Sequence, residues 1–246
     1  MGVRALQKFF ISGEKSKLLV ALHEPPNENL NAALIICHGF RGSMDGGGRA
    51  VKLAERAAAL GFTVIRFAFT PVQSLSSQIE ELSAVVDYCR CNVCSKVILL
   101  GRSMGGSCSL AFAALDERIA GLCLWATPSN LFETFQMSLG DNYKLLIEGK
   151  TVELNDEYGN LVMKPNFIED FKSYDLLDCI KNIKSPVLII HGSQDEVVSL
   201  QQARQMWHYA NNPKQLVIIE GGDHQLSKHA DFAADNVLEW LKHHFL

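Results

Sequence analysis

The chain has 246 residues, of which 48% are hydrophobic and 20% charged, and its formal net charge is −4 at pH 7. This length and apolar content suffice for one large core, so we expect a single domain over residues 1–246. The mild acidity, with Lys and Arg scattered along the chain, argues against a nucleic-acid partner. No stretch approaches the ~20 apolar residues of a membrane span, and the amino terminus lacks the apolar core of a signal peptide. We therefore expect a cytoplasmic protein without a membrane span; its oligomeric state stays open.

The cysteine content fits reduced thiols better than a disulfide framework, because the seven cysteines are an odd number. Cys89, Cys91 and Cys94 lie close together, but no fourth ligand follows at the spacing of a zinc site. We therefore expect neither a metal nor a cofactor, and any role of these three cysteines stays open.

Strand-like and helix-like stretches alternate along most of the chain, which predicts a mostly parallel sheet flanked by helices. Residues 8–22 read as an antiparallel hairpin, and the apolar run at 32–37 reads as a strand covered on both faces. A glycine-rich loop at 42–48 follows. The other predicted elements are helix 50–60, strand 62–67, a helix over 75–89 with Ser77 and Glu80 as capping box, strand 96–100, helix 103–115, strand 119–125, strand 186–190, helix 200–209, strand 215–219 and a last helix from residue 230.

The alternation stops between Thr127 and Tyr174. Residues 151–154 and 161–163 alternate around a turn at 155–159 and predict a small hairpin. The segment has more apolar residues than a solvated loop needs, so residues 127–174 are expected to form a lid inserted into the domain. A merely decorative loop is the alternative.

A short motif follows the strand at 96–100. Gly101-Arg102-Ser103-Met104-Gly105 leads directly into an apolar helix, and this strand, turn and helix have the form of a nucleophile elbow. A Cβ atom at Gly101 or Gly105 would clash in such a tight turn. Ser103 is therefore predicted to stand exposed at the tip as a nucleophile, with a chance match in a loop as the alternative.

Ser103, Asp195 and His224 follow three different predicted strands, in that chain order. The carboxyl ends of parallel strands share one edge of a sheet, and this order is the α/β-hydrolase order. A serine hydroxyl needs a base that takes its proton, and the base needs a carboxylate that orients it. We assign His224 as the base and Asp195 as the carboxylate. Glu196 and Asp223 compete with Asp195 for that role.

The other histidines fit the role of base less well. His38 and His191 precede glycine-rich turns and are expected to shape the edge of the sheet. His224 alone lies on a short loop after the last strand. The remaining histidines, on predicted helices or an edge strand, are His23, His208, His229, His243 and His244.

The oxyanion formed on attack needs N–H donors that are already in place. The backbone N–H groups of Met104, directly after the nucleophile, and Phe40, after the strand at 32–37, are the predicted donors. Large apolar residues near these strand ends are candidates for lining the substrate pocket. They are Trp125, Phe132, Phe135 and Met137.

The chain resembles the α/β-hydrolases, particularly small bacterial esterases of the feruloyl or cinnamoyl esterase and serine-aminopeptidase-like type. The resemblance covers nearly the whole chain, through His38-Gly39-Phe40, residues 101–106, 186–198 and 220–224. It implies an α/β-hydrolase fold in which Ser103, Asp195 and His224 are the triad and the lid selects the acyl or alcohol group. One departure is clear: relatives commonly carry Asp-x-x-Gly-x-Gly-x-Ser where this chain has Phe67-Ala68-Phe69-Thr70-Pro71.

These observations predict a serine esterase that cleaves small-molecule carboxylic esters through an acyl-enzyme. A thioesterase and an aminopeptidase-like amidase are alternatives, since the same triad serves thioesters and amides. A peptidase would need a carboxylate for the substrate amine, for which Glu133, Glu148 and Glu153 are candidates. A protein that keeps the hydrolase fold for binding, without turnover, is the alternative from another class.

Overall fold

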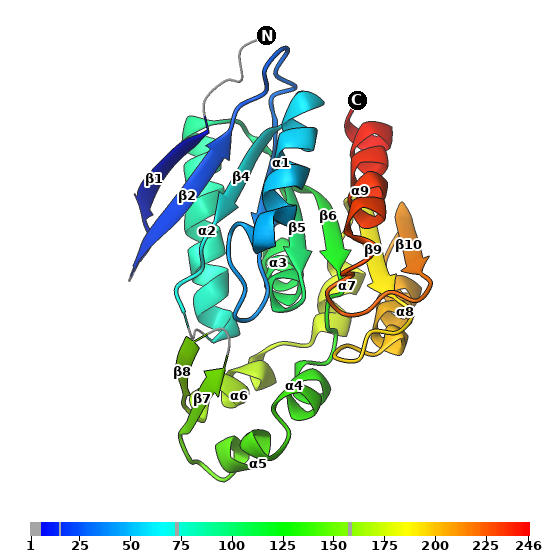
Figure 1. The fold of residues 1–246 in the computed structure, drawn as a ribbon. Helices are drawn as coiled ribbons and strands as arrows, with labels where there is room; N and C mark the ends of the chain where they lie inside the picture. The colour runs from blue at the N-terminus through cyan, green and yellow to red at the C-terminus, as the bar shows by residue number, and fades with distance from the viewer. Residues whose placement is uncertain (1–5, 15, 72–73, 157–158) are drawn as a thin grey trace.

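A computed structural model describes residues 6–14, 16–71, 74–156 and 159–246, which form an eight-stranded sheet with helices on both faces (Figure 1). The strands are β1 (Gln7–Ser12), β2 (Lys17–His23), β3 (Ala32–Cys37), β4 (Thr63–Phe67), β5 (Lys96–Arg102), β6 (Ile119–Trp125), β9 (Val187–Gly192) and β10 (Lys214–Ile219). Their order in the sheet is β1-β2-β4-β3-β5-β6-β9-β10. β1 and β2 form an antiparallel hairpin, β2 pairs antiparallel with β4, and all further pairs are parallel. The predicted hairpin and mostly parallel sheet are confirmed.

Helices cover the two faces of the sheet and separate two cores. α1 (Arg49–Ala59) and α9 (Ala230–Phe245) lie on the face toward the viewer of Figure 1. The other face carries α2 (Leu75–Asn92), α3 (Met104–Leu115), α7 (Leu176–Asn182) and α8 (Leu200–Tyr209). Each residue of β3 is buried because Leu34 and Ile36 face one core and Ala33 and Ile35 the other. This two-sided burial explains the continuous apolar run in the sequence.

Two local predictions were wrong. α2 begins at Leu75, and its N-cap is Ser74, whose side chain accepts from the Ser77 N–H group. Ser77 therefore lies in the first helical turn and does not form a capping box with Glu80. His23 also ends a strand inside the sheet, since β2 lies between β1 and β4. The first error concerns the residue at which α2 begins, and the second concerns the strand that lies beside β2. A local residue pattern reveals neither.

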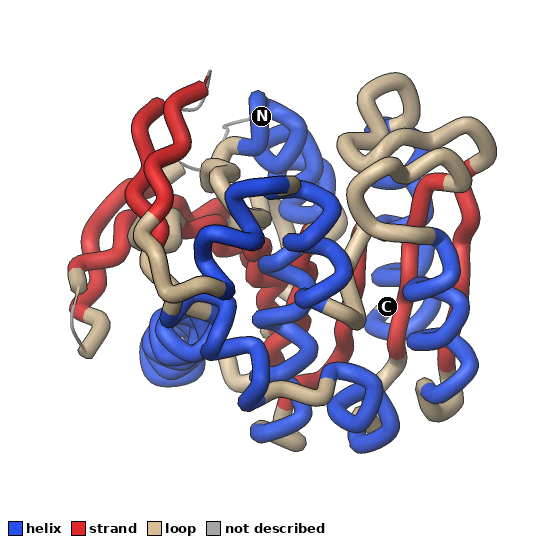
Figure 2. Tube along the Cα trace, turned by 90° about the horizontal axis from the view of Figure 1, so that it is seen from below, coloured by secondary structure: helices blue, strands red, loops and turns tan. Residues whose placement is uncertain are grey.

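The segment after β6 lies beyond the carboxyl ends of the parallel strands, the end from which Figure 2 is seen. It contains α4 (Leu131–Leu139), α5 (Asp141–Ile147), β7 (Val152–Asp156), β8 (Gly159–Met163), α6 (Asn166–Glu169) and a 3₁₀ turn at Asp170–Ser173. β7 and β8 pair antiparallel, so the predicted hairpin is confirmed; two residues of its predicted turn, 157–158, lie outside the described residues.

An aromatic cluster holds this segment together. The ring centroid of Phe135 lies 5.0 Å from that of Phe167 and 5.2 Å from that of Phe171. Phe40, on the loop after β3, joins the cluster at 5.2 Å from Phe135. The segment is also tied to α2, because the Asp170 carboxylate accepts from the backbone N–H and the hydroxyl of Ser76. The packing places the inserted segment directly over the loop that follows β3.

Candidate active site

Ser103 occupies a strained turn between β5 and α3. Its backbone has φ 52° and ψ −129°, a left-handed conformation that non-glycine residues rarely adopt. A Cβ atom at Gly101 would lie 2.4 Å from the Gly105 carbonyl oxygen, and one at Gly105 would lie 2.2 Å from the His38 carbonyl oxygen. Both distances are far inside van der Waals contact. The two glycines of the motif are thus required by the close packing that the sequence predicts.

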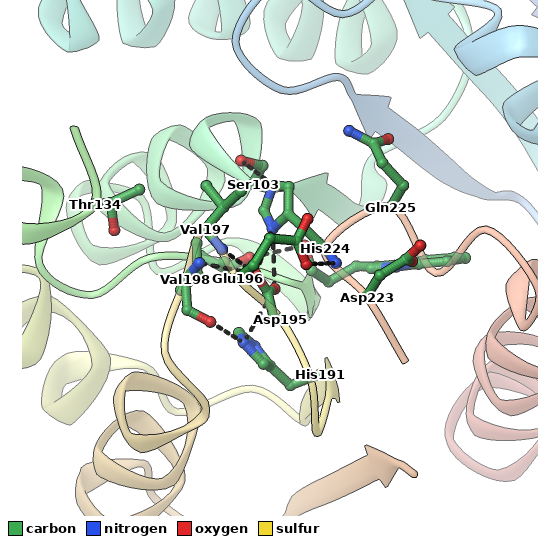
Figure 3. A network of polar contacts seen from close by, with 12 residues as sticks. Ser103, Thr134, His191, Asp195, Glu196, Val197, Val198, Asp223, His224 and Gln225 are labelled. Carbon is green, nitrogen blue, oxygen red and sulfur yellow. Dashed lines mark hydrogen bonds and ion pairs between the residues drawn. The ribbon is translucent and has the colours of Figure 1, made fainter. Parts of the chain in front are cut away.

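The structure brings Ser103, His224 and Asp195 together in one chain of contacts (Figure 3). Ser103 Oγ lies 3.1 Å from His224 Nε2. His224 Nδ1 lies 3.0 Å and 2.9 Å from the two carboxylate oxygens of Asp195. A carboxylate accepts only, so Nδ1 carries the proton and Nε2 is left to accept from the serine hydroxyl. The three residues come from the end of β5 and from the loops after β9 and β10.

The Asp195 carboxylate is fully buried and held by several donors. Its Oδ1 accepts from the backbone N–H groups of Val197 at 2.9 Å and Val198 at 2.8 Å. His191 Nε2 lies 3.3 Å from Oδ2 and donates to the Val198 carbonyl at 2.9 Å. Burial alone would raise the pKa of Asp195, but the hydrogen bond and charge of His224 and the Val198 N–H outweigh it, so this pKa lies below its usual value. Asp195 therefore stays ionised.

The competing acids have other partners. Glu196 Oε2 accepts from the backbone N–H of His224 at 3.3 Å, and Asp223 Oδ1 accepts from the Ser227 N–H at 2.8 Å. The carboxylate at the His224 imidazole is thus that of Asp195. The sequence did not indicate that Glu196 supports the His224 loop or that His191 reaches the Asp195 carboxylate.

The loop after β3 passes directly over Ser103. A Cβ atom at Gly39 would lie 2.9 Å from Ser103 Cβ, so only glycine permits this approach. His38 fixes the loop, since its Nε2 accepts from the Phe69 N–H at 3.0 Å and its Nδ1 lies 2.9 Å from the Gly39 carbonyl oxygen. Nε2 must accept there, so Nδ1 carries the proton and donates. Burial lowers the pKa of His38, which is consistent with the neutral ring.

One cavity contains Ser103 in its wall, and a second cavity shares part of that wall. The smaller, about 140 Å³, is lined by Ser103, Met104 and His224, and by Phe40 and Phe135. The larger, about 600 Å³, opens beside it between α1 and α9 and includes Trp125 in its wall.

Two other predicted pocket residues lie elsewhere. The ring of Phe132 packs 5.8 Å from that of Phe171, and Met137 is 55% exposed. Neither is among the residues that line these two cavities, and neither are Glu133, Glu148 and Glu153. Glu148 instead pairs with Lys150 at 2.7 Å. Sequence position alone did not separate residues that face the cavities from those that pack or face solvent.

No group of three or more His, Cys, Asp or Glu side chains could hold a metal ion in the described part of the chain. Cys89 and Cys94 are buried there, whereas Cys91 is exposed. Of the helices described, none has both the length and the apolar character needed to cross a membrane.

Residues 78–244 match the model of the acetyl xylan esterase (AXE1) family, and this chain belongs to that family. Its fold is that of the α/β-hydrolases. Est1E from Butyrivibrio proteoclasticus matches with a TM-score of 0.83 and 24% identity, over 96% of this chain and 98% of that one. The esterase domain of a Rhodothermus marinus protein matches with a TM-score of 0.75 and 20% identity, over 98% of this chain and 100% of that one.

Two curated proteins also match this chain. The mitochondrial palmitoyl-protein thioesterase ABHD10 of Rattus norvegicus is 25% identical over 239 residues, which cover 92% of this chain and 80% of that protein. The uncharacterized protein YfhR of Salmonella typhimurium LT2 is 26% identical over 208 residues, or 80% of this chain and 65% of that protein. This chain thus spans less than two thirds of YfhR. The family supports an esterase that acts on a small-molecule substrate.

Proposed function

We propose that this protein hydrolyses carboxylic esters with Ser103 as the nucleophile. The observation that carries the proposal is the 3.1 Å contact between Ser103 Oγ and His224 Nε2, in line with the contact from His224 Nδ1 to Asp195. A serine, a base and an orienting carboxylate at these distances can perform acyl transfer.

The reaction follows from the proton positions. His224 Nε2 takes the hydroxyl proton while Ser103 Oγ attacks the ester carbonyl, and Asp195 stabilises the resulting imidazolium. The tetrahedral intermediate collapses, the bond to the alcohol oxygen breaks, and the imidazolium returns the proton to the departing alcohol. Water then attacks the acyl-enzyme with His224 again as base, and the acid leaves as Ser103 regains its proton.

The backbone N–H groups of Phe40 and Met104 are the proposed donors to the oxyanion. Both residues line the small cavity at Ser103, and His38 holds the loop that carries Phe40. Donors held in place before the reaction spend no energy on reorganisation, and removal of one such donor typically costs ~10²–10³ in kcat.

The inserted segment, residues 127–174, is proposed to act as a lid. Its Phe135 packs against Phe40, and Thr134, Phe135 and Ser138 line the cavity at Ser103. Apolar side chains over the site exclude water and select the group that binds beneath them. The cytoplasmic location stays a prediction.

A thioesterase activity is the second candidate. It is favoured by the likeness to ABHD10, a palmitoyl-protein thioesterase, and by the 600 Å³ cavity beside Ser103, which has room for an acyl chain. Oxygen and thiol esters with the same acyl group, compared by kcat/KM, separate the two activities.

The direct test is turnover of 4-nitrophenyl esters of increasing acyl length by the parent protein, by Ser103→Ala and by His224→Gln. We expect hydrolysis by the parent and a loss of at least about 10³-fold in each variant. Equal turnover by parent and Ser103→Ala would contradict the proposal. No turnover by any of the three, with all folded, would favour a binding protein with a hydrolase fold.

A further inference from the structure

The larger cavity adjoins the cavity at Ser103. The two cavities share Gly39, Phe40, Arg102, Ser138 and Gln225 in their walls. A substrate whose ester carbonyl lies at Ser103 can therefore extend past Arg102 into the space between α1 and α9. The position of Arg102, directly before the nucleophile, places a cation at the junction.

The cavity wall is apolar where it meets the core. Five of its apolar lining residues come from β3, β5, β6, α1 and α9, and each of the five is less than one tenth exposed. They are Ile36, Leu53, Leu100, Trp125 and Ala234. Such a wall favours a hydrocarbon chain, since burial of apolar surface is the main gain in pockets of this kind.

The charged part of the lining is almost entirely cationic. Among the described residues that line the cavity, Arg41, Arg49, Lys52 and Arg102 are basic, and Asp231 is acidic. Lys52 is paired with Asp231 at 2.6 Å. This concentration of positive charge stands in a chain whose net charge is −4.

Arg49 and Arg102 converge on Gln225, next to His224. Arg49 Nη1 donates to the Gln225 carbonyl at 2.8 Å, and Arg102 Nη2 donates to the Gln225 side-chain oxygen at 2.7 Å. Arg49 makes no ion pair with a carboxylate of the described residues, although its charge helps to lower the pKa of Asp223. Neutral acceptors thus orient the Arg49 guanidinium without neutralising it.

The amino-terminal ends of two helices also contribute positive charge to the cavity wall. α1 begins at Arg49 and α9 at Ala230, both in the cavity lining, and neither has a side chain that caps its first N–H groups. The amino-terminal end of a helix carries a positive partial charge. The two helix termini therefore add partial positive charge beside the arginines, although Asp231 lies in the first turn of α9.

We propose that this cavity binds an ester substrate through an apolar chain that carries a carboxylate, with Arg49 and Arg102 holding the carboxylate. The inference rests on the proposed esterase function and narrows its substrate class. A guanidinium matches a carboxylate with two parallel hydrogen bonds, which a neutral chain end lacks. The carboxylate belongs either to the acyl part or to the alcohol part of the ester.

The test compares two pairs of substrates by titration of the released acid at constant pH. Monoethyl suberate and ethyl octanoate differ by a carboxylate on the acyl side. 6-Acetoxyhexanoate and hexyl acetate differ by a carboxylate on the alcohol side. We expect the parent to favour the anionic member of at least one pair by about tenfold or more in kcat/KM, and the pair concerned identifies the side.

Arg49→Gln and a matched control complete the test. Arg56 lies on the same helix, pairs with Asp235 and does not line the cavity. The anionic-to-neutral ratio of kcat/KM should fall about tenfold in Arg49→Gln and stay at the parental value in Arg56→Gln. Thermal unfolding of both variants verifies that they fold.

Two results would overturn the inference and leave the esterase function standing: parental hydrolysis of the neutral esters as fast as the anionic ones, or equal ratios in Arg49→Gln and Arg56→Gln. If the parent hydrolyses none of the four esters and does not hydrolyse 4-nitrophenyl acetate either, both the inference and the proposed function are overturned.

Discussion

Asp195 shows how one buried carboxylate organises its surroundings. It accepts from the backbone N–H groups of Val197 and Val198, lies against the His224 imidazole and approaches His191. These donors keep it ionised, so its charge is available to an imidazolium at His224. An uncharged isostere would keep the shape of the loop and lose that charge.

Asp195→Asn is therefore expected to lower kcat about 10³- to 10⁴-fold, because an amide no longer stabilises the imidazolium and permits the wrong tautomer of His224. The measurement is steady-state hydrolysis of 4-nitrophenyl acetate. Asp223→Asn, one residue before His224, is the control and should retain parental kcat. A similar loss in both variants would argue against Asp195 as the orienting group.

The sequence predicted that Ser103, Asp195 and His224 come together, as they do in the structure, but it did not predict the residues that support them. The three residues are recognisable because each follows a strand and their order is distinctive. The supports, His38 and His191, depend on contacts with Phe69 and Val198. Those contacts are set by the path of loops, which no short pattern encodes.

At the scale of secondary-structure elements, the side chain of Arg66 links the glycine-rich loop at 42–48 to the sheet. It lies on β4 with only 1% of its surface exposed. Its Nη1 donates to the Met44 carbonyl at 2.8 Å and to the Asp45 carboxylate, and its Nε donates to His23 Nε2 at 3.0 Å. The same loop contributes to the wall of the larger cavity. A single arginine in an otherwise apolar strand was the only sequence signal of this anchor.

His23 should make stability depend on pH. Burial and the nearby Arg66 charge lower the pKa of His23 to about 4, against 6.5 as its ordinary value. Between those pH values the unfolded chain binds the proton more readily, so the free energy of unfolding falls as the pH drops from 6.5 toward 4. The contribution of this single group is on the order of 1 kcal/mol.

Urea unfolding at pH 7 and pH 4.5 measures this effect. His23→Gln keeps an acceptor for Arg66 but has no titrating group, so the difference between the two pH values should be smaller in the variant than in the parent. If the free energy of unfolding changes between pH 7 and pH 4.5 by the same amount in both proteins, His23 is not the cause of the change.

The tight turn between β5 and α3 should not tolerate a larger residue at Gly105. Ala at Gly105 would bring Cβ to 2.2 Å from a backbone oxygen of His38, and this clash is relieved only if α3 moves away from the end of β3 and the loop after it. We expect Gly105→Ala to cost more than about 2 kcal/mol of unfolding free energy.

Gly140→Ala is the comparison for this prediction. At Gly140 nothing lies within 4 Å of an added Cβ, and only the positive φ of 55° opposes the change. Its cost should stay near 1 kcal/mol. Denaturant unfolding measures both variants, and equal costs would mean that the elbow is not tightly packed.

On the scale of the whole molecule, the sheet separates two cores and the candidate site lies at its carboxyl edge, beneath the inserted segment. The alternation of elements was enough to predict this architecture. The aromatic cluster of Phe135, Phe167 and Phe171 was not predicted, because its members lie up to 36 residues apart (135 to 171) and meet only in the folded segment. The two cavities could not be predicted from the sequence for the same reason.

The central claim is that Ser103 is an activated nucleophile, and labelling with a fluorophosphonate tests it most directly. Intact mass spectrometry of the parent should show one adduct, located on Ser103 by peptide mapping, whereas Ser103→Ala should show none. His224→Gln should label far more slowly than the parent. An adduct of equal amount on Ser103→Ala, or a folded parent that remains unlabelled, would contradict the account.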